Sequence, residues 1–426
     1  MKLKIILVIF LLLKFLWEQL LVHLTWVQRN KPLPEIVSHI YSKERYDSYI
    51  SYKKEYKKVN LITNLFSLTI EIIIILSNFY TLFDYSNPYL CVVLTLLATE
   101  IISKAIEIPL DYYSTFNIEE KYRLNKKTKR EWLKDILLNL VMEIIMSIVL
   151  YGFIVFVCSN IQEWTNNFEI NYAQSFIFCL LIALAFFAIM VLLSLLSLVM
   201  LKVQYKFTEM EDNDLRKKIE GFLSESKKKV KHIKVYNESK KSTSKNAFLL
   251  KLLWYREFGI ADNFLNENAE DELLAVLLHE IGHLKHKKNI YNYLKYLFIL
   301  LIFMFFVWLI PNARHIIDIN AYVNNSFNLK YTNYILSTSI LVYAYTPLSL
   351  IMSIFNNYVS CKEEQEADFN AVDHGYGQAL IDTFTKLSSD ELIDVNPHPF
   401  VELVEYDHPG MYRRISYIKN RQKAKK

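Results

Sequence analysis

The chain is 426 residues long, 53% hydrophobic and 22% charged, with 27 Phe and 29 Tyr but only 7 Gly. This mixture is typical of membrane segments that alternate with charged loops, and it argues against a single water-soluble globule. The net charge of +5 is small, and no basic motif with interleaved aromatic residues indicates nucleic-acid binding. The four cysteines are scattered, so neither a disulfide framework nor a cysteine-based zinc site is expected.

Seven apolar segments are each close to the roughly 20 residues needed to cross a bilayer. They cover residues 4–26, 61–83, 89–110, 136–158, 174–201, 291–310 and 335–357. The first contains Lys14 and Glu18 and lacks a small-residue cleavage site, so we expect a retained helix rather than a signal peptide. We therefore expect four parts, which are transmembrane helices 1–5 (1–201), a soluble insertion (202–290), transmembrane helices 6–7 (291–357) and a C-terminal helical region (358–426).

Basic residues alternate between the connecting loops. Lys and Arg are abundant in 27–60, in 111–135, in 202–290 and after 357, whereas 84–88 and 159–173 have none and 311–334 has only two. Cytosolic loops of membrane proteins carry an excess of Lys and Arg. This pattern predicts a lumenal or external N-terminus, with the soluble insertion and the C-terminus in the cytosol.

The apolar segments also contain charged residues that lipid would disfavour. Two explanations remain open, because the residues could pair along one helix face at i,i+4 spacing or line a wet interior cavity. The residues are Lys14, Glu18, Glu71, Glu100, Lys104, Glu107 and Glu143.

The soluble insertion changes character along its length. A charged helical start gives way to a β-rich run at 231–236, a polar stretch at 237–246 and apolar segments at 247–254 and 260–265. We expect a small sheet or hairpin here. An edge strand of such a sheet could hold an extended peptide through main-chain hydrogen bonds.

The segment 273–286 carries His-Glu-x-x-His within apolar residues at helical spacing. His279 and His283 stand at i and i+4, so both imidazoles leave one helix face and can bind a single Zn²⁺. Glu280 lies beside them, where it can act as the general base for a water molecule that attacks a carbonyl. The sequence therefore predicts zinc-dependent hydrolysis.

Two histidines need a third protein ligand and an open position for water. His286 lies roughly 60° from the face of His283 on an ideal helix, so it is a poor candidate. The segment 360–371 offers Glu364 and Asp368 at i,i+4 spacing, the first as ligand and the second as acceptor for the free N–H of a zinc-bound imidazole. Spacing alone leaves Glu363, Glu364 and Glu366 as alternatives, and a solvated acidic helix as another.

The chain resembles the CAAX prenyl protease type 1 (Ste24-like) membrane zinc metalloproteases in several separate segments. The family patterns Y-x-T-F-x-I-E-E-K, K-F-T and S-K-R-S-S-x-x-N-A-Y are similar to residues 113–121, 206–208 and 239–248. H-E-x-G-H is similar to 279–283, S-R-x-x-E-x-x-A-D to 360–368, and H-P-x-x-x-R-[LI] to 408–415.

The resemblance implies a seven-helix membrane barrel around a water-filled chamber, with a small cytosolic α+β metalloprotease portion of the gluzincin type. It selects Glu364 as the third zinc ligand and Asp368 as the carboxylate that supports the ligands without binding the metal. It also implies that Asn246 and Ala247 hold substrate backbone, with His408 and Arg414 near the metal. His408 would help to stabilise the oxyanion and Arg414 would contact substrate.

The activity implied by the resemblance is removal of the C-terminal aaX tripeptide from prenylated CaaX proteins. The implied location is the endoplasmic reticulum membrane, extending to the nuclear envelope. Three alternatives differ in class: an HtpX-like quality-control protease, a zinc-containing scaffold that clears translocons with secondary peptidase activity, and a channel or transporter. The inverted repeats that would support a transporter are absent from the sequence.

Overall fold

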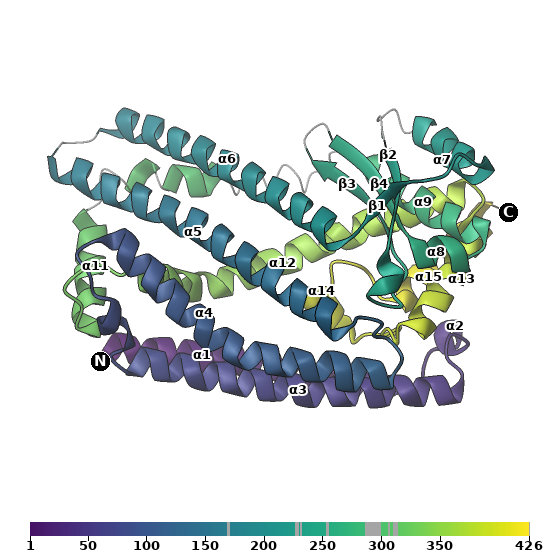
Figure 1. The fold of residues 1–426 in the computed structure, drawn as a ribbon, viewed down its shortest axis with the longest axis horizontal. Helices are drawn as coiled ribbons and strands as arrows, with labels where there is room; N and C mark the ends of the chain where they lie inside the picture. The colour runs from purple at the N-terminus through teal and green to yellow at the C-terminus, as the bar shows by residue number, and fades with distance from the viewer. Residues whose placement is uncertain are drawn as a thin grey trace.

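Long helices dominate the computed structural model, which describes residues 1–167, 171–225, 230, 232–252, 255–285, 300–305, 307–309 and 314–425. Figure 1 shows these helices running along the long axis, with a small sheet and a group of shorter helices at the end where the chain terminates. Among the described residues, six helices are long and apolar enough to cross a membrane. They are α1 (Lys2–Arg29), α3 (Lys43–Leu76), α4 (Pro88–Tyr113), α5 (Lys129–Asn167), α6 (Tyr172–Gln204) and α12 (Tyr334–Asp373).

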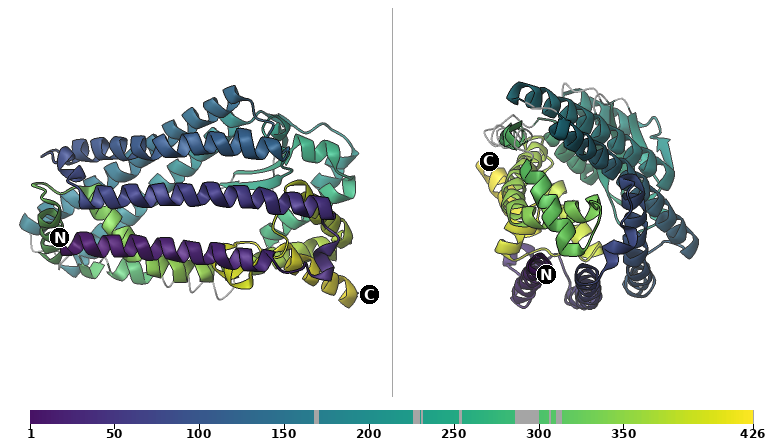
Figure 2. Two further views of the ribbon diagram at one scale, coloured as in Figure 1. Left: turned by 90° about the horizontal axis from the view of Figure 1, so that it is seen from below. Right: turned by 90° about the vertical axis from the view of Figure 1, so that its left-hand side faces the viewer.

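These six helices confirm the prediction of a mainly α, polytopic membrane protein. Their outward faces carry exposed apolar side chains such as Leu16, Ile101 and Phe187, as expected for contact with lipid. Asparagine side chains cap the start of α4 and α6, and the α6 cap is a full capping box. The end-on view in Figure 2 shows the long helices arranged around the centre of the molecule rather than in one layer.

Several helices are longer than their predicted spans, such as α5 (expected at 136–158) and α12 (expected at 335–357), and the second span is also shifted. The second apolar segment was expected at 61–83, but α3 begins at Lys43 and ends at Leu76, before a short 3₁₀ turn, η1 (Phe79–Phe83). The helix extends beyond the membrane because the polar residues that follow the Ser42 N-cap keep helical spacing and pack on other helices at the sheet end. Hydropathy detects only the part of a helix that lies in lipid.

α9 (Glu270–Lys285) lies at the sheet end, whereas α11 (Arg314–Phe327) and the start of α12 lie at the opposite end (Figure 1). Between α9 and α11 in the chain, a shorter apolar helix is found at Leu300–Leu309. Most of the predicted sixth span, 291–310, falls outside the described residues.

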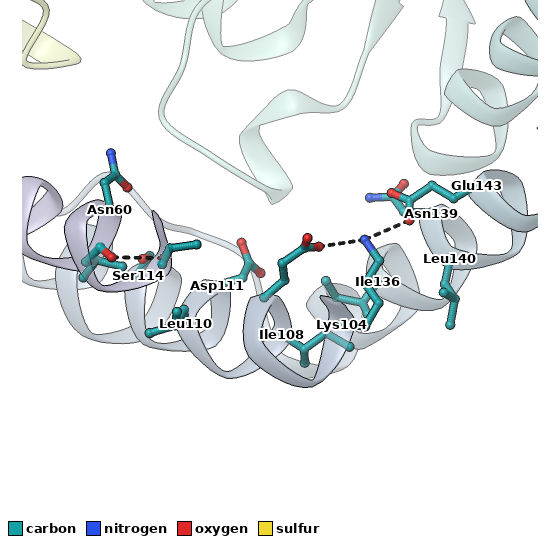
Figure 3. A pocket seen from close by; sticks show the side chains of 13 residues that line it. Asn60, Lys104, Ile108, Leu110, Asp111, Ser114, Ile136, Asn139, Leu140 and Glu143 are labelled. Carbon is teal, nitrogen blue, oxygen red and sulfur yellow. Dashed lines mark hydrogen bonds and ion pairs between the residues drawn. The ribbon is translucent and has the colours of Figure 1, made fainter. Parts of the chain in front are cut away.

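The intramembrane charges follow both of the explanations that the sequence left open. Lys14 and Glu18 pair along α1 at 3.9 Å. Lys104 instead pairs with Glu107 at 2.9 Å and, across to α5, with Glu143 at 2.8 Å. These last three side chains line a cavity of ≈ 350 Å³, and Figure 3 shows Lys104 and Glu143 within it.

The sheet has four strands in the order β1-β2-β4-β3, which confirms the predicted small sheet. β2 pairs in parallel with β4, and the other two pairings are antiparallel. β3 is therefore an edge strand. The strands are β1 (Phe207–Glu209), β2 (His232–Tyr236), β3 (Ala247–Leu252) and β4 (Tyr255–Ala261).

α9 is the centre of the soluble portion because two apolar cores meet on it. Leu274, Leu277 and Ile281 pack with the sheet and α7, whereas Ala275 and Leu278 pack with the C-terminal helices. Because α9 is apolar on most of its circumference, it is buried between these two cores, and the packing fixes its orientation. The shorter helices in the rest of the chain include α2 (Glu35–Ser38), η2 (Ser114–Glu119), α7 (Asp214–Glu225), η3 (Glu238–Lys240), α8 (Asp262–Glu267), α13 (Gly377–Asp390), α14 (Pro399–Glu405) and α15 (Met411–Lys425).

Candidate active site

The His-Glu-x-x-His segment lies in the last two turns of α9, as the sequence predicts. Three acidic residues occupy the first turn of the helix, where they interact favourably with its positive N-terminal end. His279 is buried among the packed side chains of the two cores, whereas Glu280 and His283 are half-buried. The packing on both sides thus fixes which face of α9 the two histidines occupy.

α12 crosses α9 at very short range beside the histidines. A Cβ atom placed on Gly282 would lie only 2.5 Å from the Cα atom of Ala367, so a side chain at this position would force the helices apart. The Asn370 side chain also donates to the Leu278 carbonyl across the crossing, at 2.6 Å. The crossing brings Glu364, one turn before Ala367, onto the two imidazoles.

His279, His283 and Glu364 form a cluster whose ligand atoms all lie within 4.8 Å of one another. The Nε2 atoms of the two histidines are 3.2 Å apart, and the Glu364 carboxylate lies 3.2 Å from His283 Nε2 and 3.5 Å from His279 Nε2. Glu364 Oε2 is buried and accepts no hydrogen bond among the described residues. Two imidazole nitrogens and an unsatisfied carboxylate oxygen make a donor set that fits Zn²⁺.

Asp368 lies directly behind the cluster and is 0% exposed. Its Oδ1 atom is 2.8 Å from His279 Nδ1, which leaves Nε2 of that ring facing the cluster. Arg414 donates to both Asp368 oxygens, at 2.6 and 2.9 Å, and the Tyr417 hydroxyl donates to Oδ2 at 2.8 Å. These bonds hold the carboxylate charged and in place, so that the orientation and tautomer of His279 are fixed.

His408 approaches the cluster from the segment between α14 and α15. Its Nε2 atom lies 3.2 Å from Glu364 Oε1, and its Nδ1 atom lies 2.7 Å from the Asp407 carboxylate. The hydrogen bond to Glu364 raises the pKa of the imidazole to about 9, against a smaller lowering by burial. His408 is more than half exposed, so this cationic donor faces the open side of the site.

A cavity of ≈ 190 Å³ opens in front of the cluster and gathers residues from distant parts of the chain. Asn246 and Ala247, at the start of the edge strand β3, form one wall. Lys245, before β3, and Phe264, on α8, also line it. The remaining lining residues come from α9, α12, α13 and the C-terminal segment, and include His279, Glu280, Glu364, His408 and Arg414.

The structure thus brings together all nine residues that the sequence analysis singled out. Arg414 differs from its expected surroundings, since it is only 6% exposed and its recorded polar contacts are with Asp368, Glu364 and His279. Tyr417, which donates to Asp368, was not identified from the sequence. Only its i+3 spacing from Arg414 on α15 could have indicated that the two side chains lie on one helix face. His286 lies outside the described residues.

A membrane bundle with an HExxH helix, a crossing glutamate and an adjacent edge strand defines an integral membrane metalloprotease. Family models match two regions: "CAAX prenyl protease N-terminal, five membrane helices" matches residues 23–197, and "Peptidase family M48" matches residues 209–422. The chain belongs to peptidase family M48.

Individual proteins resemble the chain over most of its length. It is 26% identical to the "Probable CAAX prenyl protease 1" of Schizosaccharomyces pombe, over 97% of this chain and 88% of the relative. It is 24% identical to CAAX prenyl protease 1 of Saccharomyces cerevisiae, over 76% of this chain and 71% of the relative. The crystal structure of S. mikatae Ste24p has the same fold, with a TM-score of 0.77 and 21% identity over 97% of this chain and 98% of the other.

Proposed function

We propose that this metalloprotease removes the C-terminal aaX tripeptide from prenylated CaaX proteins. The observation that carries the proposal is the convergence of His279, His283 and Glu364 within 4.8 Å, in a cavity walled by the start of β3 at one end of a membrane bundle. The names of the relatives from two yeasts support the substrate class. A protease at this place can receive a peptide whose lipid anchor stays in the bilayer.

His279, His283 and Glu364 would hold Zn²⁺, which when bound polarises the scissile carbonyl and acidifies the attacking water. Glu280 lies in the same cavity and ligates nothing in this arrangement, so its carboxylate is available to take the proton from that water and pass it to the leaving amine. Asp368 keeps the proton of His279 on Nδ1 and so acts through the ligand rather than on the substrate.

The edge strand β3 would hold the substrate in an extended conformation. Among the described strands β3 pairs only with β4, so main-chain groups on its other side would be available to an added strand. Asn246 and Ala247 line the cavity in front of the cluster and would contact the substrate backbone. In this proposal the carbonyl to be cleaved would lie between Glu280 and His408, which line the same cavity.

His408 would stabilise the negative charge that develops on the carbonyl oxygen, because its imidazole reaches the cluster from the open side. Arg414 lines the cavity but is buried against Asp368, so we assign it a positioning role. The basic loops at the sheet end support a cytosolic active site and a lumenal N-terminus in the endoplasmic reticulum or nuclear envelope.

The test is cleavage of a farnesylated CaaX peptide by the purified protein, followed by mass spectrometry of the released tripeptide. Glu280→Gln is expected to lower kcat by about 10²–10⁴-fold while bound zinc stays stoichiometric. Glu364→Ala is expected to lose both zinc and activity, whereas Glu366→Ala, an exposed neighbour on α12, retains both.

Two results would contradict the proposal. Retained zinc in Glu364→Ala would show that another carboxylate is the ligand. Cleavage restricted to unprenylated membrane proteins would favour the quality-control function instead, and zinc binding without any cleavage would favour the scaffold.

A further inference from the structure

A cavity of ≈ 330 Å³ lies between the start of α5 and the end of α6, and it shares no lining residue with the two cavities described above. Lys134 and Asp135 directly precede the apolar segment of α5 at 136–158, and Lys202 directly follows that of α6 at 174–201. Both helix ends lie on the side of the molecule that carries the sheet (Figure 1). The cavity is therefore at the level where a bilayer changes from acyl chains to headgroups.

Polar bonds fix the shape of this cavity. Asp135 is 9% exposed, and its carboxylate binds Lys241 at 2.9 Å and Lys127 at 3.0 Å. The Gln204 side chain at the end of α6 donates to the Asn139 Oδ1 atom on α5 at 2.9 Å. These bonds join α5, α6 and the turn that precedes β3, so the lining is already assembled before any ligand arrives.

The cavity lining is positively charged, with five lysines against the two acidic residues Glu131 and Asp135. Both acids already have partners, since Glu131 accepts from the Thr128 hydroxyl at 3.1 Å and Asp135 binds its two lysines. A third acid, Glu238, interacts with Tyr205 from outside the lining, and counting it still leaves an excess of positive charge. The five lysines are Lys134, Lys202, Lys206, Lys240 and Lys241.

Three of these lysines are available to a ligand. Lys134, Lys206 and Lys240 are exposed, and no ion pair is recorded for them among the residues that the structure describes. Lys202 lies 3.4 Å from the buried Glu257 carboxylate. Ammonium groups beside hydrocarbon attract an anion more strongly than those in bulk water, because the low dielectric on one side weakens screening.

An exposed apolar stripe leads from the cavity along each helix. On α6, four apolar side chains at i,i+3,i+7,i+11 are 43–58% exposed, and the last, Val203, lines the cavity. They are Leu192, Leu195, Val199 and Val203. On α5, Lys134 is followed at the same spacing by the exposed side chains of Leu137, Val141 and Ile145. Residues at this spacing share one helix face.

The stripe on α5 points away from the interior of the bundle. Glu143, which lines the polar cavity formed by α3, α4 and α5, comes nine residues after Lys134 and so lies about 180° round the helix from it. Lipid therefore covers the stripe. A ligand with an anionic head and apolar chains matches the cavity and the stripes together.

We propose that this cavity binds the phosphate headgroup of an anionic phospholipid, whose acyl chains lie along the stripes of α5 and α6. Lysine ammonium groups bind phosphate, and basic pockets between transmembrane helices hold anionic headgroups. Lys240 belongs to η3, between β2 and β3, so the bound lipid would connect the membrane helices to the sheet. The site is separate from the metal cluster and does not depend on the proposed proteolysis.

The test is native mass spectrometry of the full-length protein in detergent, titrated with phosphatidylinositol 4-phosphate to obtain a Kd. The double variant Lys134→Gln/Lys206→Gln is expected to bind this lipid about tenfold more weakly than the wild type, because it removes two of the available cations. Lys54→Gln/Lys58→Gln is the matched control. It removes the same charge from exposed lysines of α3 outside the cavity and is expected to keep the wild-type Kd.

A wild-type Kd in the cavity variant would overturn the inference, and so would an equal loss in both double variants, which would show a general effect of charge. Titration with the deacylated headgroup, glycerophosphoinositol 4-phosphate, separates a lipid from a soluble phosphate. Binding of that headgroup as tight as that of the lipid would show that the stripes contribute nothing and that the ligand is not a lipid. All variants are expected to keep the wild-type Tm without added lipid, because the replaced side chains are exposed.

Discussion

Asp368 shows how much of the metal centre depends on a residue outside the ligand set. Its carboxylate is fully buried and receives bonds from three side chains on two other helices, at His279, Arg414 and Tyr417. A buried carboxylate in this position is stable only because all its partners are present. Loss of any one partner leaves the others with unsatisfied charge or hydrogen bonds.

Asp368→Asn is therefore expected to weaken zinc binding by about 10–100-fold, because the neutral amide is a weaker acceptor for the N–H of His279 and leaves Arg414 without its counter-charge. Competition with a chromogenic chelator measures the affinity. Asp373→Asn is the control, since Asp373 lies on the same helix and forms an exposed bidentate pair with Arg421. Equal zinc affinity in wild type and Asp368→Asn would show that the carboxylate has no role at the metal.

His408→Ala is expected to lower kcat by about 10²–10³-fold with zinc content unchanged, because the variant removes a donor from the developing oxyanion. Steady-state kinetics together with metal analysis measure both quantities. A variant that loses zinc as well would show instead that His408 supports Glu364, which it contacts at 3.2 Å.

The identities of the metal-binding residues were the part of the site that could best be predicted from the sequence. The i,i+4 spacing in α9 and α12 is local, so His279, His283, Glu364 and Asp368 could be proposed from it. The family resemblance put Arg414 near the metal, but no periodicity in the chain indicates that Arg414 and Tyr417 bind Asp368, because that contact depends on how α15 packs after folding.

At the scale of elements, the α9–α12 crossing decides whether the ligands converge. Gly282→Ala adds only one methyl group, yet that group would meet the backbone of Ala367 at 2.5 Å. We expect separation of the helices, a loss of unfolding free energy of about 1–3 kcal/mol and weaker zinc binding. Thermal unfolding and chelator competition measure these changes. Gly221→Ala, where a Cβ meets nothing within 4 Å, is the control.

The start of β3 is held by Glu391, which follows α13. Its Oε1 atom accepts from Lys245 N at 2.9 Å and from Ser244 Oγ at 3.1 Å. Glu391→Ala is expected to raise KM about three- to tenfold with little change in kcat, because the strand proposed to bind substrate loses its anchor. Glu391→Gln keeps an acceptor oxygen and should retain the wild-type KM. A wild-type KM in the alanine variant would contradict this role.

Glu391 also makes stability depend on pH, since burial raises the pKa of its carboxyl above the usual value. The cost of burying the charged form is absent below the unfolded pKa and grows as pH rises through the folded pKa. Glu391→Gln should therefore match the wild type near pH 4 and exceed its Tm at pH 7.5 by about 1–3 °C. Thermal unfolding across this range checks the sign, and a lower Tm of the variant at pH 7.5 would contradict it.

At the scale of the whole molecule, the two termini lie toward opposite ends of the long axis (Figure 1). Spans, sheet and charge alternation could be predicted from the sequence because hydropathy and loop composition are properties of continuous segments. The residues that line the cavities could not be predicted in this way. Lys104 pairs with Glu143 across two helices rather than with Glu100 on its own, and such pairings depend on how helices rotate against one another.

The proposed orientation can be measured with single cysteines in a background where Cys91, Cys158, Cys179 and Cys361 are alanine. In sealed microsomes, Lys423→Cys should react with an impermeant maleimide, whereas Ser86→Cys should react only after permeabilisation. These residues are exposed and lie on loops or helix ends at opposite ends of the bundle. The reverse pattern would place the active site in the lumen.

α12 is one continuous helix of 40 residues that carries Glu364 and Asp368 near its end, and at 1.5 Å per residue it is about 60 Å long. Its first half lies in lipid, with Pro347 as its single interior proline. A change in bilayer thickness tilts such a helix, and the tilt moves the third metal ligand relative to α9. Activity in bilayers of graded acyl-chain length should therefore pass through a maximum, and replacing Pro347 by Ala should shift the position of that maximum.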